Sequence, residues 1–303
     1  MSTRDTTATR EHTERSGESP PMLPGVASFS FEVLPLEPTL MIARELGFER
    51  VDIAGFSDRG RCSFEPAAVA RDPEGQARVL LPLLERYRLA VSDYFVQFGA
   101  APSLEALNSP DEAVLKRNLE MLKGAARFAA LIGSPGITVL PGVDHGGRRD
   151  TAELDRAGEA LRRAMEITSA EGIQLRFEPH MGSVADTPEL ALAIIGMVPE
   201  LTVTLDVAHF TLQYIPLDRV LPLIAHTGHV HVRQAKAGTL QVAWEEGTID
   251  FPRILRELSH RGYAGTLTVE YVCADWYGVN RNDTLHESMR AGEALREMLH
   301  ALS

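Results

Sequence analysis

Residues 173–206 read IQLRFEPHMGSVADTPELALAIIGMVPELTVTLD. The stretch begins and ends with two short β-rich runs, Ile173–Glu178 and Thr202–Asp206, whose alternating apolar and polar residues are typical of strands. Between the runs, Asp186-Thr187-Pro188 begins a helical segment that ends near Val198, because a side-chain acceptor followed by proline fits the first turn of a helix. Strand, helix and strand in this order predict one βα unit of a parallel sheet.

The same alternation continues in both directions along the chain. Eight runs are predicted as strands: Val26–Glu32, Arg50–Ile53, Leu89–Phe95, Gly136–Leu140, Ile173–Glu178, Thr202–Asp206, His229–Val232 and Thr266–Tyr271. The predicted helices are Thr39–Leu46, Gly75–Tyr87, Asp111–Leu131, Thr151–Glu171, Pro188–Val198, Pro216–Ala225, Asp250–Arg261 and Leu285–Leu302. In a chain of 303 residues, eight βα units fit an α/β fold of one domain, the (β/α)8 TIM barrel, better than two smaller domains.

The first 22 residues differ from the rest of the chain in composition. Residues 1–22 are rich in Thr, Ser, Arg and Glu and contain almost no apolar side chains. Burial of this segment could not offset the entropy lost on ordering it. We therefore expect a flexible N-terminal tail over 1–22 and the barrel over 23–303.

Charge and composition exclude several classes of function. The chain has 42 acidic and 30 basic residues and a net charge of −12, so its surface repels nucleic acids and anionic membranes. It contains neither a run of about 20 apolar residues nor a signal-peptide core, which predicts a cytoplasmic protein. Cys62 and Cys273 are far apart and lack CxxC spacing, so thiolate metal clusters are not expected.

Polar residues alternate with apolar ones along the predicted strands and share one face of each. In a barrel surrounded by helices the apolar face lies outward, so the polar sets line the interior and end at the rim where barrel active sites form. Four strands end there in Glu178, Asp206, His231 and Glu270. A single carboxylate at a strand end is equally well explained by solvation or hydrogen bonding. Three carboxylates in one cavity, however, would repel each other unless a cation bound them.

Carboxylate oxygens with one imidazole suit a single divalent cation. An oxygen-rich ligand set favours Mn²⁺ or Mg²⁺, with Co²⁺ or Zn²⁺ as alternatives. Half of the ten histidines lie in or just after predicted strands four to seven, at His145, His180, His209, His229 and His231. His229 lies one inward layer deeper than His231, so His231 is predicted as the ligand and His229 as a supporting or core group.

Four motifs at the ends of the last four strands resemble the xylose-isomerase-like barrels. They are Phe177-Glu178-Pro179-His180, Leu205-Asp206-Val207-Ala208-His209, His229-Val230-His231-Val232-Arg233 and Thr268-Val269-Glu270-Tyr271. The family includes sugar-phosphate isomerases and epimerases, ketose 3-epimerases, inosose dehydratases and metal-dependent apurinic endonucleases. The resemblance is strongest from Gly172 to Val272.

The resemblance implies a divalent metal held by Glu178, Asp206, His231 and Glu270, with His209 near the substrate. It also implies that Glu178 and Glu270 act as acid and base on opposite faces of a carbon next to a carbonyl. The expected activity is isomerisation or epimerisation of a sugar, polyol or keto-sugar through a metal-stabilised enediolate.

The chain departs from the ketose epimerases at two places. A second glutamate and an arginine that they use for substrate hydroxyls are replaced here by segments 181–184 and 234–237. His180 and Arg233 are available instead, and His180 beside the metal also suits a lyase or dehydratase that performs β-elimination on a keto-cyclitol or keto-glycoside. The apurinic endonucleases need a histidine in the loop Lys236–Thr248, which contains none. A third alternative is a barrel that only binds, against which the intact ligand set argues.

Candidate substrate contacts come from the loops and from the first half of the chain. Arg233, His145 and Glu32 are predicted near the predicted rim. Trp244 and Trp276, in the loops after strands seven and eight, can cover the site or stack on a sugar ring. They can equally pack between loops or across a subunit interface, so a homo-oligomer is possible. The expected partner is a small carbohydrate or polyol, with no nucleic acid and no membrane.

Overall fold

The computed structural model describes residues 22–57, 60–147, 151–274, 277 and 279–302. The predicted tail therefore lies outside the described residues except for Met22, which is buried. Trp276 also lies outside them.

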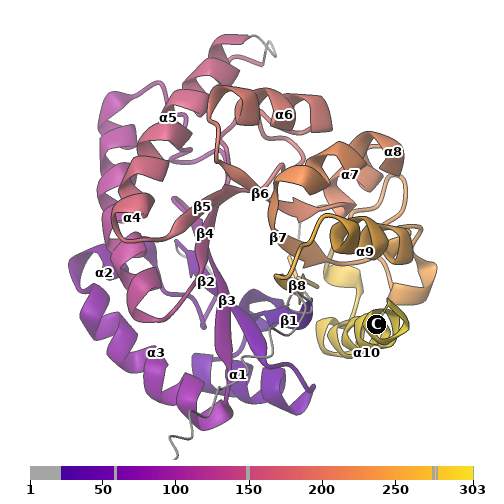
Figure 1. Cartoon of the computed structure of the whole chain (residues 1–303). Helices are drawn as coiled ribbons and strands as arrows, with labels where there is room; N and C mark the ends of the chain where they lie inside the picture. The colour runs from indigo at the N-terminus through magenta and orange to yellow at the C-terminus, as the bar shows by residue number, and fades with distance from the viewer. Residues whose placement is uncertain (1–21, 58–59, 148–150, 275–276, 278, 303) are drawn as a thin grey trace, which may run out of the picture.

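Eight parallel strands form a closed barrel in sequence order, and the helices surround it (Figure 1). The strands are β1 (Leu23–Ala27), β2 (Arg50–Phe56), β3 (Ala90–Gln97), β4 (Gly136–Val139), β5 (Gln174–Phe177), β6 (Thr202–Asp206), β7 (Thr227–Val232) and β8 (Thr266–Val269). The helices are α1 (Leu36–Glu45), α2 (Pro66–Arg71), α3 (Pro73–Tyr87), α4 (Glu112–Leu131), α5 (Thr151–Ala170), α6 (Pro188–Met197), α7 (Ala208–Leu212), α8 (Leu217–Val220), α9 (Phe251–His260) and α10 (Thr284–Leu302). The prediction of a (β/α)8 TIM barrel is confirmed.

Several helices begin at the capping residues that the sequence predicts. The Thr187 hydroxyl accepts a hydrogen bond from the Leu190 backbone N–H at the start of α6, and Pro188 occupies the first turn. Asp250 accepts in the same way from Arg253 at the start of α9. These acceptors satisfy backbone N–H groups that have no partner within the helix.

The first strand is shorter than predicted. β1 ends at Ala27, and Ser28–Phe31 form a 3₁₀ helix, η1, in place of the second half of the strand. The Phe31 carbonyl accepts from the Leu34 N–H, which turns the chain at the rim. Glu32 consequently follows a turn and does not end a strand, so the prediction that it extends the inward row of β1 is wrong.

The second and third strands are longer than predicted. β2 and β3 extend to Phe56 and Gln97, further than their weak alternation indicates. Single-turn or short helices, α2, α7 and α8, occupy segments predicted as loops or as part of a longer helix. Along the described residues, no helix is both long enough and apolar enough to span a membrane.

The predicted division of each strand into an apolar and a polar face positions the site. In β5 and β6, Leu175, Phe177, Val203 and Leu205 are buried and belong to the hydrophobic core. The alternate residues point into the barrel, where the Thr138 and Thr204 hydroxyls lie 2.5 Å apart. Backbone register pairs Asp206 with His231, so the ends of β6 and β7 lie at one level.

Candidate active site

The predicted metal ligands gather at the carboxyl ends of β5 to β8. Glu178 follows β5, Asp206 is the last residue of β6, His231 lies near the end of β7 and Glu270 follows β8. All four residues are at most 5% exposed. Burial of ionisable groups at this density costs free energy unless they are paired or bind a cation.

One ring nitrogen of His231 faces two carboxylates. Its Nδ1 atom lies 3.0 Å from Oε1 of Glu178 and 2.7 Å from Oε2 of Glu270. A ring nitrogen carries at most one proton, and among the described residues the buried Oε2 of Glu270 has no hydrogen bond of suitable geometry. The ligand atoms of Glu178, His231 and Glu270 all lie within 4.8 Å of one another. Three converging lone-pair donors with an unsatisfied oxygen fit a divalent cation.

Asp206 is next to this cluster but is bound differently. Its Oδ2 atom lies 2.5 Å from a guanidinium nitrogen of Arg233, and its Oδ1 atom accepts from the Ala208 N–H at 2.9 Å. Arg233 also lies 3.2 Å from Oε1 of Glu270. The structure thus brings Glu178, His231 and Glu270 together and pairs the fourth predicted ligand, Asp206, with Arg233.

The two glutamates have opposite pKa shifts. Burial raises the pKa of Glu178, and this effect outweighs its hydrogen bond with His231. Burial also acts to raise the pKa of Glu270, but the charges of Arg233 and His231 overcome it and lower the pKa to about 2. Burial raises the pKa of Asp206 to about 6 despite its pairing with Arg233. Pairs of carboxyl groups with divergent pKa values are typical of acid–base sites.

His180 and His209 lie side by side, with ring centroids 4.0 Å apart. Nδ1 of His180 lies 2.7 Å from the Met181 carbonyl oxygen, which can only accept, so the proton is on Nδ1 and Nε2 carries the lone pair. Burial lowers the pKa of His180 to about 4, so the ring is neutral at pH 7. Nε2 of His209 accepts from Arg233 at 3.0 Å.

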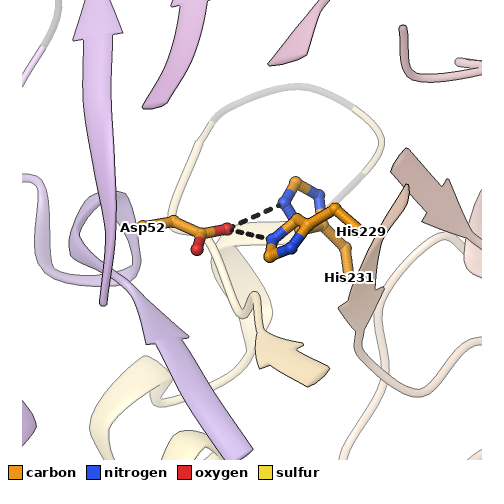
Figure 2. Close-up of side chains that lie close together, drawn as sticks. All are labelled: Asp52, His229 and His231. Atoms are coloured by element: carbon orange, nitrogen blue, oxygen red, sulfur yellow. Dashed lines mark hydrogen bonds and ion pairs between the residues drawn. The ribbon is translucent and has the colours of Figure 1, made fainter. Parts of the chain in front are cut away.

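Sequence reasoning missed the residue beneath these ligands, Asp52 of β2. One oxygen of its carboxylate faces the rings of His229 and His231 from across the barrel (Figure 2). The only signal in the sequence is that Asp52 alternates with the apolar Val51 and Ile53 in a weak strand. Its pKa is lowered, because the two histidines outweigh the effect of burial.

A cavity of about 240 Å³ opens above the cluster. Of the predicted site residues, Glu178, His180, Arg233 and Glu270 line it. The opposite wall is aromatic and is formed by Phe29, Phe56 and Phe95, which the sequence did not single out. Tyr277, next to the predicted Trp276, also lines the cavity.

Three predicted substrate contacts lie elsewhere among the described residues. His145 is directed to Glu153, with its Nδ1 atom 3.2 Å from Oε2. Trp244 stacks on Phe251, with ring centroids 5.4 Å apart, at the start of α9. Glu32 follows η1, and its backbone carbonyl accepts a hydrogen bond from the Arg61 N–H at 2.7 Å. None of the three is among the residues that line the cavity in the described part of the chain.

Comparison with known proteins was decisive for the family. The model of the family described as xylose isomerase-like TIM barrel matches residues 40–298. The chain belongs to this family. The resemblance of the four strand-end motifs is therefore confirmed.

Individual family members are more distant. A putative L-ribulose-5-phosphate 3-epimerase, UlaE, from Shigella dysenteriae serotype 1 is 28% identical over 248 residues, which cover 76% of this chain and 80% of the relative. A solved D-tagatose 3-epimerase-like protein superimposes with a TM-score of 0.72 at 23% identity, covering 92% of this chain and 98% of that one. The probable 3-DHS dehydratase AsbF from Bacillus anthracis has a TM-score of 0.67 at 17% identity, covering 91% and 99%. The two solved structures show the shared fold.

Proposed function

We propose that this protein is a divalent-metal-dependent sugar epimerase, an isomerase that inverts a carbon next to the carbonyl of a keto-sugar. The observation that carries the proposal is the approach of Glu178 and Glu270 to one nitrogen of His231 at the wall of a cavity. The names of the sugar 3-epimerases to which the chain is similar support the same reaction class.

The proposed metal ligands are Glu178, His231 and Glu270, with Asp206 as the fourth. Mn²⁺ or Mg²⁺ suits this oxygen-rich set best, and Co²⁺ or Zn²⁺ is an alternative. When bound, such an ion supplies a Lewis acid that polarises the carbonyl and hydroxyl oxygens of a sugar.

The two glutamates are proposed to move the proton. Arg233 lies 3.2 Å from Glu270 and favours its ionised form, so this carboxylate can accept the proton from the C–H next to the carbonyl. Glu178 is proposed to return a proton to the other face of the same carbon through the carboxyl oxygen that does not bind the cation; burial raises the pKa of this group and favours the protonated form. In the reverse direction the two roles are exchanged.

The remaining polar groups are proposed to bind and orient the sugar. Arg233 lines the cavity and holds Asp206, His209 and Glu270 through its guanidinium group, so it fixes three side chains while facing the substrate. His209, predicted near the substrate, is not among the described residues that line the cavity; it is proposed to orient Arg233, which lies 3.0 Å from its Nε2 atom, while His180 at the cavity wall contacts the sugar. The aromatic wall excludes water, which strengthens these electrostatic interactions.

A lyase or dehydratase is the second candidate. The supporting observation is His180, a neutral imidazole at the cavity wall whose Nε2 lone pair can act as a base for β-elimination. The segment after it, which includes Met181 and Ser183 at the cavity wall, replaces the second glutamate of the ketose epimerases.

Incubation of keto-sugars with the protein in D₂O separates the two reactions. Epimerisation predicts a product of unchanged composition that carries deuterium at the inverted carbon, detected by NMR and mass spectrometry. Loss of water or of an aglycone would instead establish the elimination reaction. If no candidate keto-sugar exchanged its proton, the proposed chemistry would be wrong.

The proposed setting of the enzyme is the cytoplasm, where it acts on a small carbohydrate without a nucleic-acid or membrane partner. The net charge of −12 supports this proposal, because it disfavours binding to phosphate backbones and anionic lipids. Gel-shift and vesicle-sedimentation assays at low ionic strength should show no binding.

A further inference from the structure

Asp52 lies on the inward face of β2, on the far side of the barrel from His231, and its side chain is fully buried. Its Oδ2 atom lies 2.7 Å from Nε2 of His229 and 3.2 Å from Nε2 of His231 (Figure 2). Its Oδ1 atom accepts from the hydroxyl groups of Ser92 at 2.5 Å and Thr268 at 3.0 Å. Four side chains from β3, β7 and β8 thus converge on one carboxylate.

The hydrogen-bond partners of Asp52 determine where the protons lie on Ser92, Thr268, His229 and His231. An ionised carboxylate only accepts, and it has room for about four donors. Ser92 and Thr268 donate to one oxygen, so both histidines donate to the other through Nε2–H. The tautomer of a neutral histidine is set by the hydrogen bond that its other nitrogen makes.

The position of the proton on Nε2 determines which atom of the His231 ring can bind a cation. Burial opposes a charge on His231, but the carboxylates around it raise its pKa, so without a cation Nδ1 also carries a proton, directed to Glu178 and Glu270 at 3.0 and 2.7 Å. A divalent cation would take the place of that proton, and the proton that Asp52 accepts would stay on Nε2. We propose that Asp52 is a positioning residue, which rests on the proposed function: it holds His231 in the tautomer and orientation that present Nδ1 to a divalent cation shared with the two glutamates.

The neighbouring strand contains a contrasting aspartate. Asp93 of β3 pairs in register with Asp52 and is equally buried, but its side chain forms an ion pair with Arg176. Burial of a carboxylate in this layer therefore does not by itself require a histidine partner. Asp52, in contrast, contacts His229 and His231 of β7, and His231 is the proposed metal ligand.

The first test measures Mn²⁺ affinity of metal-stripped protein by calorimetry for wild type, Asp52→Asn and a control, Asp93→Asn. Asparagine has nearly the same shape as aspartate, but its NH₂ group would face either the two hydroxyl groups or the two imidazole N–H groups. The Mn²⁺ affinity should therefore fall by about 10–100-fold, as it does when other groups that orient metal-binding histidines are changed. Asp93→Asn changes a carboxylate of the same buried layer whose partner is Arg176, so the Mn²⁺ affinity of the folded protein should stay within about threefold. Asp52→Asn with affinity within threefold of wild type would overturn the proposal.

A second measurement determines the tautomer directly in the wild-type chain, and two variants serve only to assign its signals. Protein with ¹⁵N-labelled histidine and bound Mg²⁺ should show His229 and His231 protonated at Nε2, with signals assigned by His229→Gln and His231→Gln. A proton on Nδ1 of His231 would overturn the proposal. If the Mn²⁺ affinities follow the expected order while no keto-sugar is epimerised, the sugar reaction is wrong and the role of Asp52 stands.

Discussion

The two halves of the barrel rim contrast in chemistry. The ends of β5 to β8 carry the acidic and imidazole side chains that converge on His231. The ends of β1 to β3 carry Phe29, Phe56 and Phe95, whose ring centroids lie 5.1–5.8 Å from one another. Phe95 also contacts the ring of His231 at 5.8 Å between centroids.

The contrast indicates that the two sides of the rim have different roles. The polar half supplies groups that bind a cation and move a proton, whereas the aromatic half removes water from the same cavity and so raises the strength of charge interactions. Asp52 is the exception, because it comes from the apolar half and contacts the polar one. Substitutions on the two sides should therefore affect different measurable quantities.

The largest effect is expected on the polar side. Glu270→Gln removes the carboxylate that Arg233 keeps ionised, so turnover of a keto-sugar should fall by roughly 10²–10⁴-fold, the usual value of a general base. Glu245→Gln is the matched control, because Glu245 is exposed and pairs with Arg290 on the surface. Steady-state kinetics of the two variants measure the difference. Equal turnover in both would remove Glu270 from the proton-transfer step.

The next effect concerns the stability of the barrel interior. Asp93→Asn leaves the buried Arg176 without its charge partner and should lower the free energy of unfolding by about 3–5 kcal/mol, measured by urea denaturation. Mn²⁺ affinity of the folded fraction should stay close to that of wild type, because neither residue contacts the metal cluster. A large loss of Mn²⁺ affinity would mean that the ion pair of Asp93 and Arg176 is energetically coupled to the metal cluster.

A smaller effect is expected on the aromatic side. Phe95→Leu removes roughly 40 Å² of apolar surface from the cavity wall, which corresponds to about 1 kcal/mol and roughly a fivefold rise in KM. The value of kcat should change little, because this contact is made equally in the ground and transition states. If kcat fell and KM did not change, the aromatic wall would take part in the chemical step.

The smallest effect is expected from a residue that the sequence placed at the site. Trp244→Phe should change KM by less than about twofold, because its ring stacks on Phe251 outside the cavity lining and phenylalanine preserves much of that contact. Substrate titrations of the two proteins provide the comparison. A KM increase of tenfold would show that the loop closes over the substrate.

The sequence predicted the barrel and the polar half of the rim, because both depend on local alternation. Glu178, His231 and Glu270 each end a clear strand, and the parity of β5, β7 and β8 alone directs them inward. The aromatic half was not predicted. Ser28–Phe31 alternate like a strand but form a 3₁₀ turn, because a backbone hydrogen bond to Leu34 turns the chain at the rim.

Contacts across the barrel also lay beyond sequence reasoning. Asp52 is 177 residues from His229 along the chain, and no local pattern indicates which strand it faces. The pairing of Arg233 with Asp206 is likewise a property of packing, since both residues also have the parity expected of metal or substrate contacts. Such contacts depend on closure of the barrel and on the register of its strands, and neither can be read from a local sequence pattern.

The metal content of the purified protein tests the central claim most directly. Elemental analysis should find close to one divalent ion per chain in wild type and a marked loss in Glu178→Gln and His231→Ala, since each variant removes one of the three converging ligands. Circular dichroism confirms that the variants are folded. Metal content that is unchanged in both folded variants would contradict the assignment of the site.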